Sequence, residues 1–430
     1  MFIILCIAKL LMRALNLLHR GATTLPGRIA LRLKPNILFS LSRDVYCICV
    51  TGTNGKTTTC AMIEKGLIAN NKPCFINKGG ANMMSGVVTA FIKNATLFGK
   101  PRCKYAVLEC DENSLPLITG SINAKIIAVT NVFRDQLDRY GEINTTLEKI
   151  RQGISNSPNA VVILNADCPV TYSLKFRCKN DVISFGIDCK SGVSVVSDSP
   201  LCPLCSAKLS YHSLIYAQLG SFYCPVCKYH RIKPDLLATD ICNSSFNIGE
   251  KRINMSLGGI YNIYNFLSAA AVMEHLGLSY LPIQFFGGSF GRTESFYNGN
   301  NKITLMLVKN PVGFSSCINL AFTQYGIFNS IFALNDNDAD GRDVSWIWDV
   351  SFGRVSSNKC YTIGTRAYDM AVRLKYDDVK AMVIENENYR QMIDTIICDN
   401  TDFVIFASYT AMMDMRHLLI ESFGGDEFWQ

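Results

Sequence analysis

The stretch that decides the fold is VTGTNGKTTT, residues 50–59. It follows an apolar run, residues 45–50, that predicts a buried strand, and it precedes residues 60–68, whose apolar spacing predicts a helix. Glycines in such a turn let backbone N–H groups approach phosphate oxygens, and the start of the next helix favours negative charge. We therefore expect Lys56 to reach the β- and γ-phosphates of a nucleotide and the Thr57 hydroxyl to bind magnesium.

The spacing of the glycines leaves an alternative open. The strict phosphate-binding pattern has four residues between its glycines, whereas only two separate Gly52 from Gly55. An ordinary turn would have the same letters. The strand before it and the helix after it favour nucleotide binding.

The composition is that of a globular protein with more than one domain. The chain has 430 residues, of which 49% are hydrophobic and 18% charged, and its net charge is +7. It contains no long Lys/Arg run, so we expect no nucleic-acid partner, although an anionic substrate or a membrane surface remains compatible with the charge.

The 18 cysteines do not indicate a disulfide-bonded secreted protein. Many stand singly in apolar runs, as Cys47 and Cys110 do, where a free thiol behaves as a small hydrophobic side chain. A nucleotide site also indicates the cytosol, where thiols stay reduced. We expect a cytoplasmic protein.

The N-terminus is apolar over residues 1–8, but Lys9 and Arg13 interrupt it well short of the roughly 20 residues that span a bilayer. The pattern also lacks the charge order and cleavage site of a signal peptide. We expect an amphipathic helix through about His19 that either packs on the nucleotide domain or rests on the membrane surface.

Strands and helices alternate beyond the phosphate-binding turn, which predicts a parallel sheet covered by helices. The predicted strand at residues 105–108 ends in Glu109, and the one at residues 126–130 ends in Asn131. Ligands bind at the carboxyl ends of such strands. Glu109 is therefore a candidate second ligand for magnesium, with a solvated acidic loop as the alternative.

A different pattern interrupts this alternation. Two C-x-x-C pairs, Cys202 with Cys205 and Cys224 with Cys227, are separated by eighteen residues. This spacing predicts a tetrahedral zinc site. Four thiolates leave no open position for water or substrate, so we expect a structural ion. A nucleic-acid-binding ribbon is the alternative, but few basic residues lie nearby.

A last α/β unit is expected to follow the Gly/Asn-rich residues 298–301, where we place a domain boundary. Its most unusual segment is an acidic loop, residues 335–343, followed by SWIWD, residues 345–349. Solvated surface or an isolated calcium loop would explain the acidic residues. The spacing lacks the glutamate that closes an EF-hand.

These landmarks together resemble the Mur ligases. The resemblance rests on TGTNGKTT at residues 51–58 with Glu109, Asn131, Asn262, Asn265 and Arg292. A narrower resemblance to the MurT branch rests on RDQLDRYGE at residues 134–142, the zinc ribbon, and DGRDVSWIWD at residues 340–349. Two departures concern Gln136, which stands where many Mur ligases have His, and the carbamylated lysine of many Mur ligases, for which we assign no residue.

The resemblance implies an α/β protein built on a Mur-ligase P-loop ATPase domain. We expect an N-terminal helical segment over residues 1–43, the ATPase domain over 44–299 with a zinc ribbon inserted at about 198–234, and a C-terminal Rossmann-like domain over 300–430. Because the chain leaves little room before the ATPase domain for the usual UDP-substrate domain, the resemblance implies a substrate that the membrane holds through its lipid.

By resemblance, ATP would phosphorylate the D-glutamate α-carboxylate of the lipid II stem peptide, and ammonia would displace phosphate to give D-isoglutamine. The chain shows no glutaminase domain, so a separate GatD-type subunit would supply the ammonia. Lys56 and Glu109 would be catalytic, and Asp349 would complete the partner's Cys–His site in trans, with a buried structural Asp as the alternative. The residues implied to hold ATP and magnesium are Gly52, Thr53, Asn54, Gly55, Lys56, Thr57, Thr58, Glu109, Asn131, Asn262, Asn265 and Arg292.

Two other functions remain possible at this stage. An amino-acid-adding ligase of the Mur or folylpolyglutamate type would share the ATP chemistry, although it normally carries more substrate-binding chain. A zinc-ribbon nucleotide-binding protein without ligase activity is the second alternative. Salt-dependent nucleic-acid binding would favour it.

Overall fold

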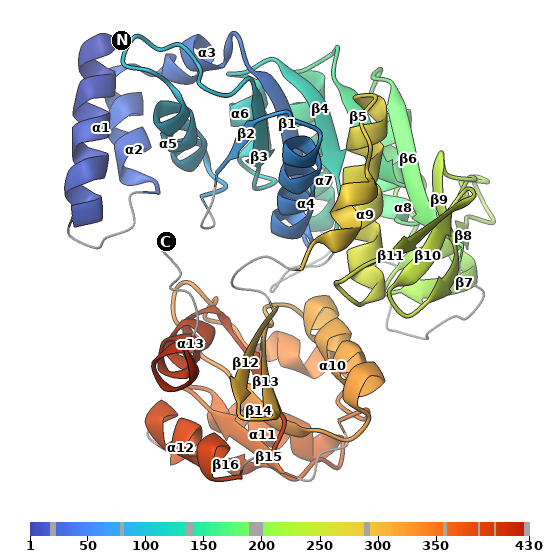
Figure 1. The fold of residues 1–430 in the computed structure, drawn as a ribbon. Coiled ribbons are helices and arrows are strands. Elements are labelled where there is room, and N and C mark those ends of the chain that lie inside the picture. Colours follow the sequence, from blue (N-terminus) through green and yellow to red (C-terminus); the bar gives the residue numbers. More distant parts are fainter. Residues whose placement is uncertain are drawn as a thin grey trace. The chain divides into compact units, whose positions relative to one another are not determined.

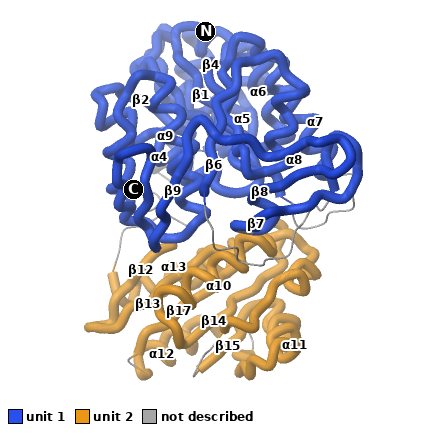
Figure 2. Tube along the Cα trace, turned by 90° about the vertical axis from the view of Figure 1, so that its right-hand side faces the viewer, with its two compact units in different colours: residues 1–134, 139–287 blue, residues 135–138, 288–430 orange. Residues whose placement is uncertain are grey.

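The structure is a computed structural model that describes residues 1–17, 23–77, 81–133, 142–188, 201–287, 293–355, 359–385, 388–399 and 401–424. The chain forms two compact units (Figure 2). The first includes the described residues up to Gly287, and the second includes those from Thr293 onward. Each unit is described by itself.

The first unit is built on a nine-stranded sheet in the order β11-β10-β9-β6-β5-β4-β1-β3-β2 (Figure 1). The strands from β1 to β6, with β9, run parallel, and β10 and β11 extend the edge as an antiparallel meander. Its strands are β1 (Tyr46–Thr51), β2 (Cys74–Ile76), β3 (Tyr105–Glu109), β4 (Ala124–Val129), β5 (Val161–Asn165), β6 (Val182–Ile187), β9 (Leu236–Cys242), β10 (Ser245–Ile248) and β11 (Lys251–Asn254).

Helices cover both faces of this sheet, which is why its central strands are continuous apolar runs. Helices α4 and α9 pack against each other on one face, and α5, α6 and α7 lie against the other (Figure 1). The helices are α4 (Lys56–Ala69), α5 (Met84–Asn94), α6 (Leu115–Thr119), α7 (Glu142–Ser155), α8 (Pro169–Tyr172) and α9 (Ile260–His275). The predicted α/β fold is confirmed.

Three N-terminal helices, α1 (Phe2–Leu17), α2 (Leu25–Leu33) and α3 (Ile37–Ser42), pack at one end of the first unit. Gly27 brings α2 so close to α5 that a Cβ on it would lie 1.9 Å from the Ser85 carbonyl oxygen. The Gly27 N–H also donates to Thr89 Oγ1 at 2.9 Å. The N-terminal helix is therefore joined to the nucleotide domain through α2.

The cysteine-rich segment forms a small antiparallel hairpin, β7 (Ser210–Tyr216) and β8 (Leu219–Tyr223). It leaves the large sheet after β6 and returns at β9, and these two strands pair directly, with Phe185 opposite Leu236. An insertion between adjacent strands leaves the sheet continuous.

The second unit is a six-stranded sheet in the order β12-β13-β17-β14-β15-β16, parallel except for β12. Separate apolar clusters fill its two faces, under α10 and α11 on one side and α12 and α13 on the other. The elements are β12 (Thr293–Asn298), β13 (Asn301–Leu307), α10 (Pro311–Tyr325), β14 (Asn329–Ala333), β15 (Cys360–Ile363), α11 (Ala367–Tyr376), β16 (Met382–Val383), α12 (Tyr389–Asp399), β17 (Phe403–Ala407) and α13 (Tyr409–Phe423).

The division between the units falls earlier than the boundary expected at residues 299 and 300. Strand β12 pairs with β13, with Asn298 opposite Asn301, so it belongs to the second sheet. Gly299, at a φ of 59°, lies in the two-residue turn between these strands. The Gly/Asn-rich stretch is a hairpin turn, which uses the same residue types as a linker.

Candidate active site

The phosphate-binding turn connects β1 to α4 at the carboxyl edge of the first sheet, where the strand order reverses between β3 and β4. Gly52 and Gly55 both have positive φ, 120° and 84°. A Cβ on Gly52 would lie 2.5 Å from the Asn131 carbonyl oxygen, and one on Gly55 would lie 2.1 Å from Asn265 Oδ1. Both positions therefore require glycine for space as well as for conformation.

The turn is held from the next strand by the residues that follow β4. The Asn54 N–H donates to Asn131 Oδ1 at 2.9 Å, and Asn131 Nδ2 donates to the Asn54 carbonyl oxygen at 3.0 Å. Thr130 Oγ1 donates to the same carbonyl at 2.7 Å, and the Thr53 N–H donates to the Asn131 carbonyl at 2.9 Å. These bonds fix the backbone of the turn.

Lys56 is the first residue of α4, and its ammonium group lies inside the turn. Its Nζ donates to the Gly52 carbonyl oxygen at 2.6 Å and lies 3.2 Å from Glu112 Oε1. Both charged side chains of this ion pair are largely buried. An incoming phosphate would compete with Glu112 for the ammonium group.

Glu109 ends β3 beside Val50 of β1, and its side chain is buried. Its backbone is held by Asn77, whose Oδ1 accepts from the Glu109 N–H and whose Nδ2 donates to the Glu109 carbonyl, both at 2.8 Å. Burial and then the charge of Glu109 raise the pKa of the Cys60 thiol. Cys60 follows Thr57 by one helical turn on α4, and α4 packs against β3, which ends at Glu109.

Helix α9 supports the start of α4 through two buried asparagines. Asn262 Nδ2 donates to the Gly258 carbonyl at 2.7 Å, and Asn265 Nδ2 donates to Asn262 Oδ1 at 3.2 Å. Asn265 Oδ1 accepts from Thr59 Oγ1 at 3.4 Å and lies against Gly55. Through these side-chain amides, the start of α9 contacts both the turn and the first residues of α4.

The structure thus brings most of the expected nucleotide residues to one edge of the first sheet. Arg292 and the segment 134–141 lie outside the described residues. Sequence reasoning missed Thr130, Asn77 and Glu112 as contributors to this edge. Their positions could have indicated two of these residues, because Thr130 directly precedes Asn131 and Glu112 lies three residues after Glu109. Nothing in the sequence distinguishes Asn77.

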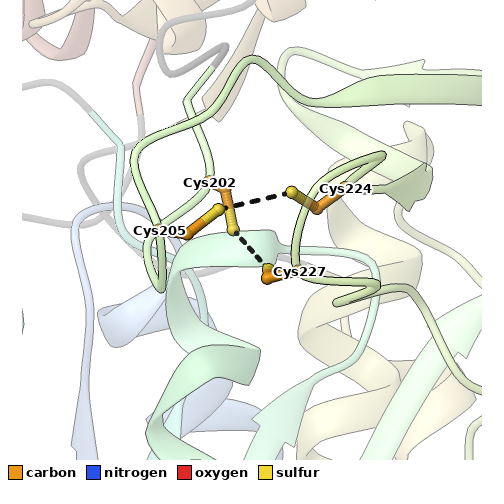
Figure 3. Close-up of side chains that lie close together, drawn as sticks. All are labelled: Cys202, Cys205, Cys224 and Cys227. Carbon is orange, nitrogen blue, oxygen red and sulfur yellow. Dashed lines mark hydrogen bonds between the residues drawn. The ribbon is translucent and has the colours of Figure 1, made fainter.

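The four cysteines converge as their spacing predicts (Figure 3). Their Sγ atoms all lie within 4.8 Å of one another, with Cys202 3.5 Å from Cys227 and Cys205 3.5 Å from Cys224. Tetrahedral zinc with Zn–S bonds of about 2.3 Å would separate its sulfurs by about 3.8 Å. The arrangement fits a zinc ribbon.

The ribbon packs against the same edge of the sheet as the phosphate-binding turn. Gln218, at the tip of the β7–β8 hairpin, is fully buried, and its Nε2 donates to the Val132 carbonyl at 2.6 Å. Arg231, just beyond the second cysteine pair, forms an ion pair with the buried Asp167 at 2.6 Å. Tyr264 of α9 donates to the other oxygen of Asp167 at 2.8 Å. The ribbon is thereby tied to both the segment after β4 and α9.

Asp349 lies in the second unit, at the end of a short 3-10 helix (Ser345–Asp349), and its side chain is exposed. Its alternative was a buried residue, and the structure places Asp349 at the surface. Trp346 of the same helix is buried in the core, whereas Trp348 is 49% exposed and its ring lies 5.1 Å from that of Tyr376 on α11.

Two aspartates of the acidic loop before this helix make contacts within the second unit. Asp340 Oδ1 accepts from the Thr410 N–H at 2.8 Å, in the first turn of α13. Asp336 forms an ion pair with Arg366 at 2.9 Å. These contacts use the carboxylates that an isolated calcium loop would need.

Comparison with known proteins agrees with this architecture. Residues 50–273 match the Mur ligase middle domain, and residues 307–412 match the MurT ligase C-terminal family. Among solved structures, the pseudomurein peptide ligase type C from Methanothermus fervidus is similar at a TM-score of 0.69 and 20% identity, over 88% of this chain and 79% of that one. MurF from Acinetobacter baumannii is similar at 0.66 and 17%, over 92% and 80%. The chain belongs to the Mur ligase family and is an ATP-dependent ligase.

Within that family, relatives that match nearly the whole chain include MurT proteins. The lipid II isoglutaminyl synthase (glutamine-hydrolyzing) subunit MurT of Streptococcus pneumoniae is 38% identical over 94% of both chains. The protein of the same name from Staphylococcus aureus is 33% identical over 98% of both. The chain is a member of the MurT group.

Proposed function

We propose that this chain is the ligase subunit of a lipid II isoglutaminyl synthase and amidates the D-glutamate α-carboxylate of the lipid II stem peptide. The observation that carries the proposal is the glycine turn around Lys56, in a chain that matches MurT proteins over 94% to 98% of its length. Phosphoryl transfer needs mainly positioning and charge neutralisation, and the turn and Lys56 would supply both.

The proposed reaction has two steps. A carboxylate oxygen of D-glutamate attacks the γ-phosphorus of ATP, the bond to the bridging oxygen breaks, and an acyl phosphate and ADP form. Ammonia then attacks the acyl carbon and loses a proton, and phosphate leaves with the original carboxylate oxygen. Lys56 would neutralise the charge that develops on the transferred phosphoryl group.

Two metals would serve different purposes. Magnesium would neutralise phosphate charge, held by Thr57 and Glu109, whose hydroxyl and carboxylate oxygens are the ligand types it prefers. Zinc would hold the ribbon together through Cys202, Cys205, Cys224 and Cys227, a role that the sulfur geometry supports. Asn131, Asn262 and Asn265 would act by holding the turn in shape.

Ammonia would come from a GatD-type glutaminase subunit that binds the second unit near Asp349. Three features support this. The Asp349 side chain is exposed, Trp348 beside it is half exposed, and α11 presents Tyr368, Val372 and Tyr376 to solvent at four-residue intervals. An exposed aromatic patch of this kind is typical of a protein-binding surface. The assembly would act in the cytoplasm at the inner face of the membrane, where lipid II is accessible.

The ammonia source provides the test. The complex is given lipid II, ATP and magnesium with either glutamine or ammonium chloride, and the product is weighed by mass spectrometry. We expect Asp349→Asn to lower glutamine-driven amidation by at least about a hundredfold, because loss of a His-orienting carboxylate has effects of that order. Amidation with ammonium chloride should be unchanged.

Asp338→Asn is the matched control, since Asp338 is an exposed carboxylate of the same unit that pairs with Arg342. It should leave both activities unchanged. Equal loss of both activities in Asp349→Asn would contradict the role in trans. Addition of an amino acid in place of amidation would replace the proposed function with that of an amino-acid-adding ligase.

A further inference from the structure

Helix α1 has apolar residues on two faces. One face packs against the rest of the first unit, and the other is exposed to solvent. Leu5 and Ala8 are buried, whereas Ile3, Ile7 and Leu10 are exposed, with Ile3 at 70% and Leu10 at 63%. The exposed residues follow a helical spacing, so they form one stripe along the outside of the helix. Figure 1 shows α1 as the outermost helix at the end of the first unit remote from the β7–β8 hairpin.

The turn between α5 and β3 extends this stripe. The ring of Phe98 lies 5.7 Å from that of Phe2, and the Phe98 side chain is 80% exposed. We call Phe2, Ile3, Ile7, Leu10 and Phe98 together the outer face of α1. A soluble surface rarely exposes so many large apolar side chains in one place unless it binds something.

The charge around the outer face is of one sign. The first 43 residues contain seven Lys or Arg and no Asp or Glu, and residues 84–104 contain four and none. The net charge of the whole chain is only +7, so the remaining residues carry more acidic than basic side chains. The positive charge is therefore concentrated in the segments that form the end of the first unit that carries α1.

These cations lie close to the helix. Lys9 Nζ donates to the Ala95 carbonyl oxygen, which joins α1 to the end of α5. Burial lowers the pKa of Lys9, and the charges of Arg102 and Arg13 lower it further. Arg13 and Arg102 are both exposed, so their guanidinium groups are available to anions.

From these observations we propose that the outer face of α1 binds an anionic lipid surface. An apolar stripe flanked by cations and free of acidic residues is the pattern of a helix that lies in the membrane interface. Among the described helices, none is long and apolar enough to cross a bilayer. The proposal rests on the proposed function for its purpose, since a lipid-linked substrate would lie in that same surface.

Vesicle binding tests the proposal on the full-length protein. Vesicles of phosphatidylcholine alone or with phosphatidylglycerol are floated with the protein in a density gradient. We expect binding to the anionic vesicles that weakens with salt. We expect a loss of at least about tenfold in Leu10→Glu, because the substitution removes a leucine that the lipid would cover and places an anion against anionic lipid.

The chain offers a closely matched control. Leu117 of α6 is exposed to the same extent as Leu10, at 63%, on another helix of the same unit. Leu117→Glu should bind vesicles as the wild type does. Arg13→Glu should lose binding to the anionic vesicles while its heat stability stays unchanged.

Several results would overturn the proposal. The wild type could fail to float with anionic vesicles, or Leu10→Glu could float as well as the wild type. If Leu10→Glu instead abolished self-association or capture of the glutaminase subunit, the outer face would be a protein interface. Amidation of a short-chain, water-soluble lipid II analogue separates the two proposals: Leu10→Glu should retain it, whereas failure of the proposed function would leave every variant inactive.

Discussion

At the residue scale, Asn131 uses both ends of its side-chain amide on the backbone of Asn54. A side chain occupied in this way would act on a nucleotide through the shape of the turn. A Mur-type resemblance alone assigns it to the nucleotide site without saying how it acts. The structure therefore suggests a positioning residue whose loss would affect binding of ATP more than the chemical step.

We predict that Asn131→Ala raises the KM for ATP by about tenfold or more with a smaller change in kcat, because two hydrogen bonds of about 1 kcal/mol each are lost. Asn131→Asp keeps the acceptor for the Asn54 N–H and loses the donor, so it should fall between the wild type and the alanine variant. Steady-state amidation at varied ATP measures both constants. An unchanged KM for ATP in the alanine variant would contradict the role.

The residues found by sequence reasoning and those missed differ in kind. Lys56, Thr57 and Glu109 stand in local patterns, a glycine turn and the end of an apolar strand, so the sequence predicts them. Asn77 and Gln218 act by side-chain bonds to backbone atoms of distant segments, the Glu109 and Val132 carbonyls. No local pattern encodes such a contact, because the fold decides which segments meet.

At the scale of elements, the two C-x-x-C turns have matching backbones. In the first, the backbone N–H of Cys202 donates to the Ala207 carbonyl at 2.7 Å, and in the second, the backbone N–H of Cys224 donates to the Tyr229 carbonyl at 2.7 Å. Ser206 and Lys228 occupy equivalent positions with φ of 62° and 63°. The two turns have the same backbone hydrogen bond and the same φ after the second cysteine. The C-x-x-C motif therefore determines its local structure, which is why the sequence predicted it.

The hairpin between the two turns reaches the segment that holds the phosphate-binding turn, through Gln218 and Val132. We predict that Gln218→Leu, which keeps the volume and removes the donor, raises the KM for ATP several-fold. Its zinc content should stay at that of the wild type, because Gln218 is not a cysteine ligand. Elemental analysis and amidation kinetics measure the two quantities.

Cys224→Ser is the comparison variant, because it should lose zinc and raise the KM together. If Gln218→Leu kept the KM of the wild type, the ribbon would stabilise the unit without shaping the nucleotide site. The several-fold rise in the KM for ATP expected of Gln218→Leu corresponds to the loss of one hydrogen bond to a buried carbonyl, which contributes about 1 kcal/mol.

Sequence reasoning at this scale was accurate for buried strands and weak for turns. The apolar runs at residues 105–108 and 360–363 are strands in the structure, because strands buried on both faces consist of apolar residues. The Gly/Asn-rich residues 298–301 were expected to mark a domain boundary, and in the structure they form the turn of the β12–β13 hairpin. Turns and linkers share residue types, so composition does not separate them.

At the scale of the whole molecule, each of the two units has its own core and its own part of the proposed reaction. The first carries the phosphate-binding turn and the four-cysteine ribbon, and the second carries the exposed Asp349. The alternation of strands and helices predicted both α/β units. The exposed stripe on α1 was not decided by the sequence, because an amphipathic pattern does not say how much of a helix the fold covers.

In the proposed reaction, ATP phosphorylates a substrate carboxylate, and Lys56 neutralises the charge on the transferred phosphoryl group. The most direct measurement uses lipid II whose D-glutamate α-carboxylate carries labelled oxygen, with ATP, magnesium and ammonia. We predict one labelled oxygen in the released phosphate for each amide formed, and loss of both products by at least about a hundredfold in Lys56→Ala. Amide formation with unlabelled phosphate, or full activity in Lys56→Ala, would contradict it.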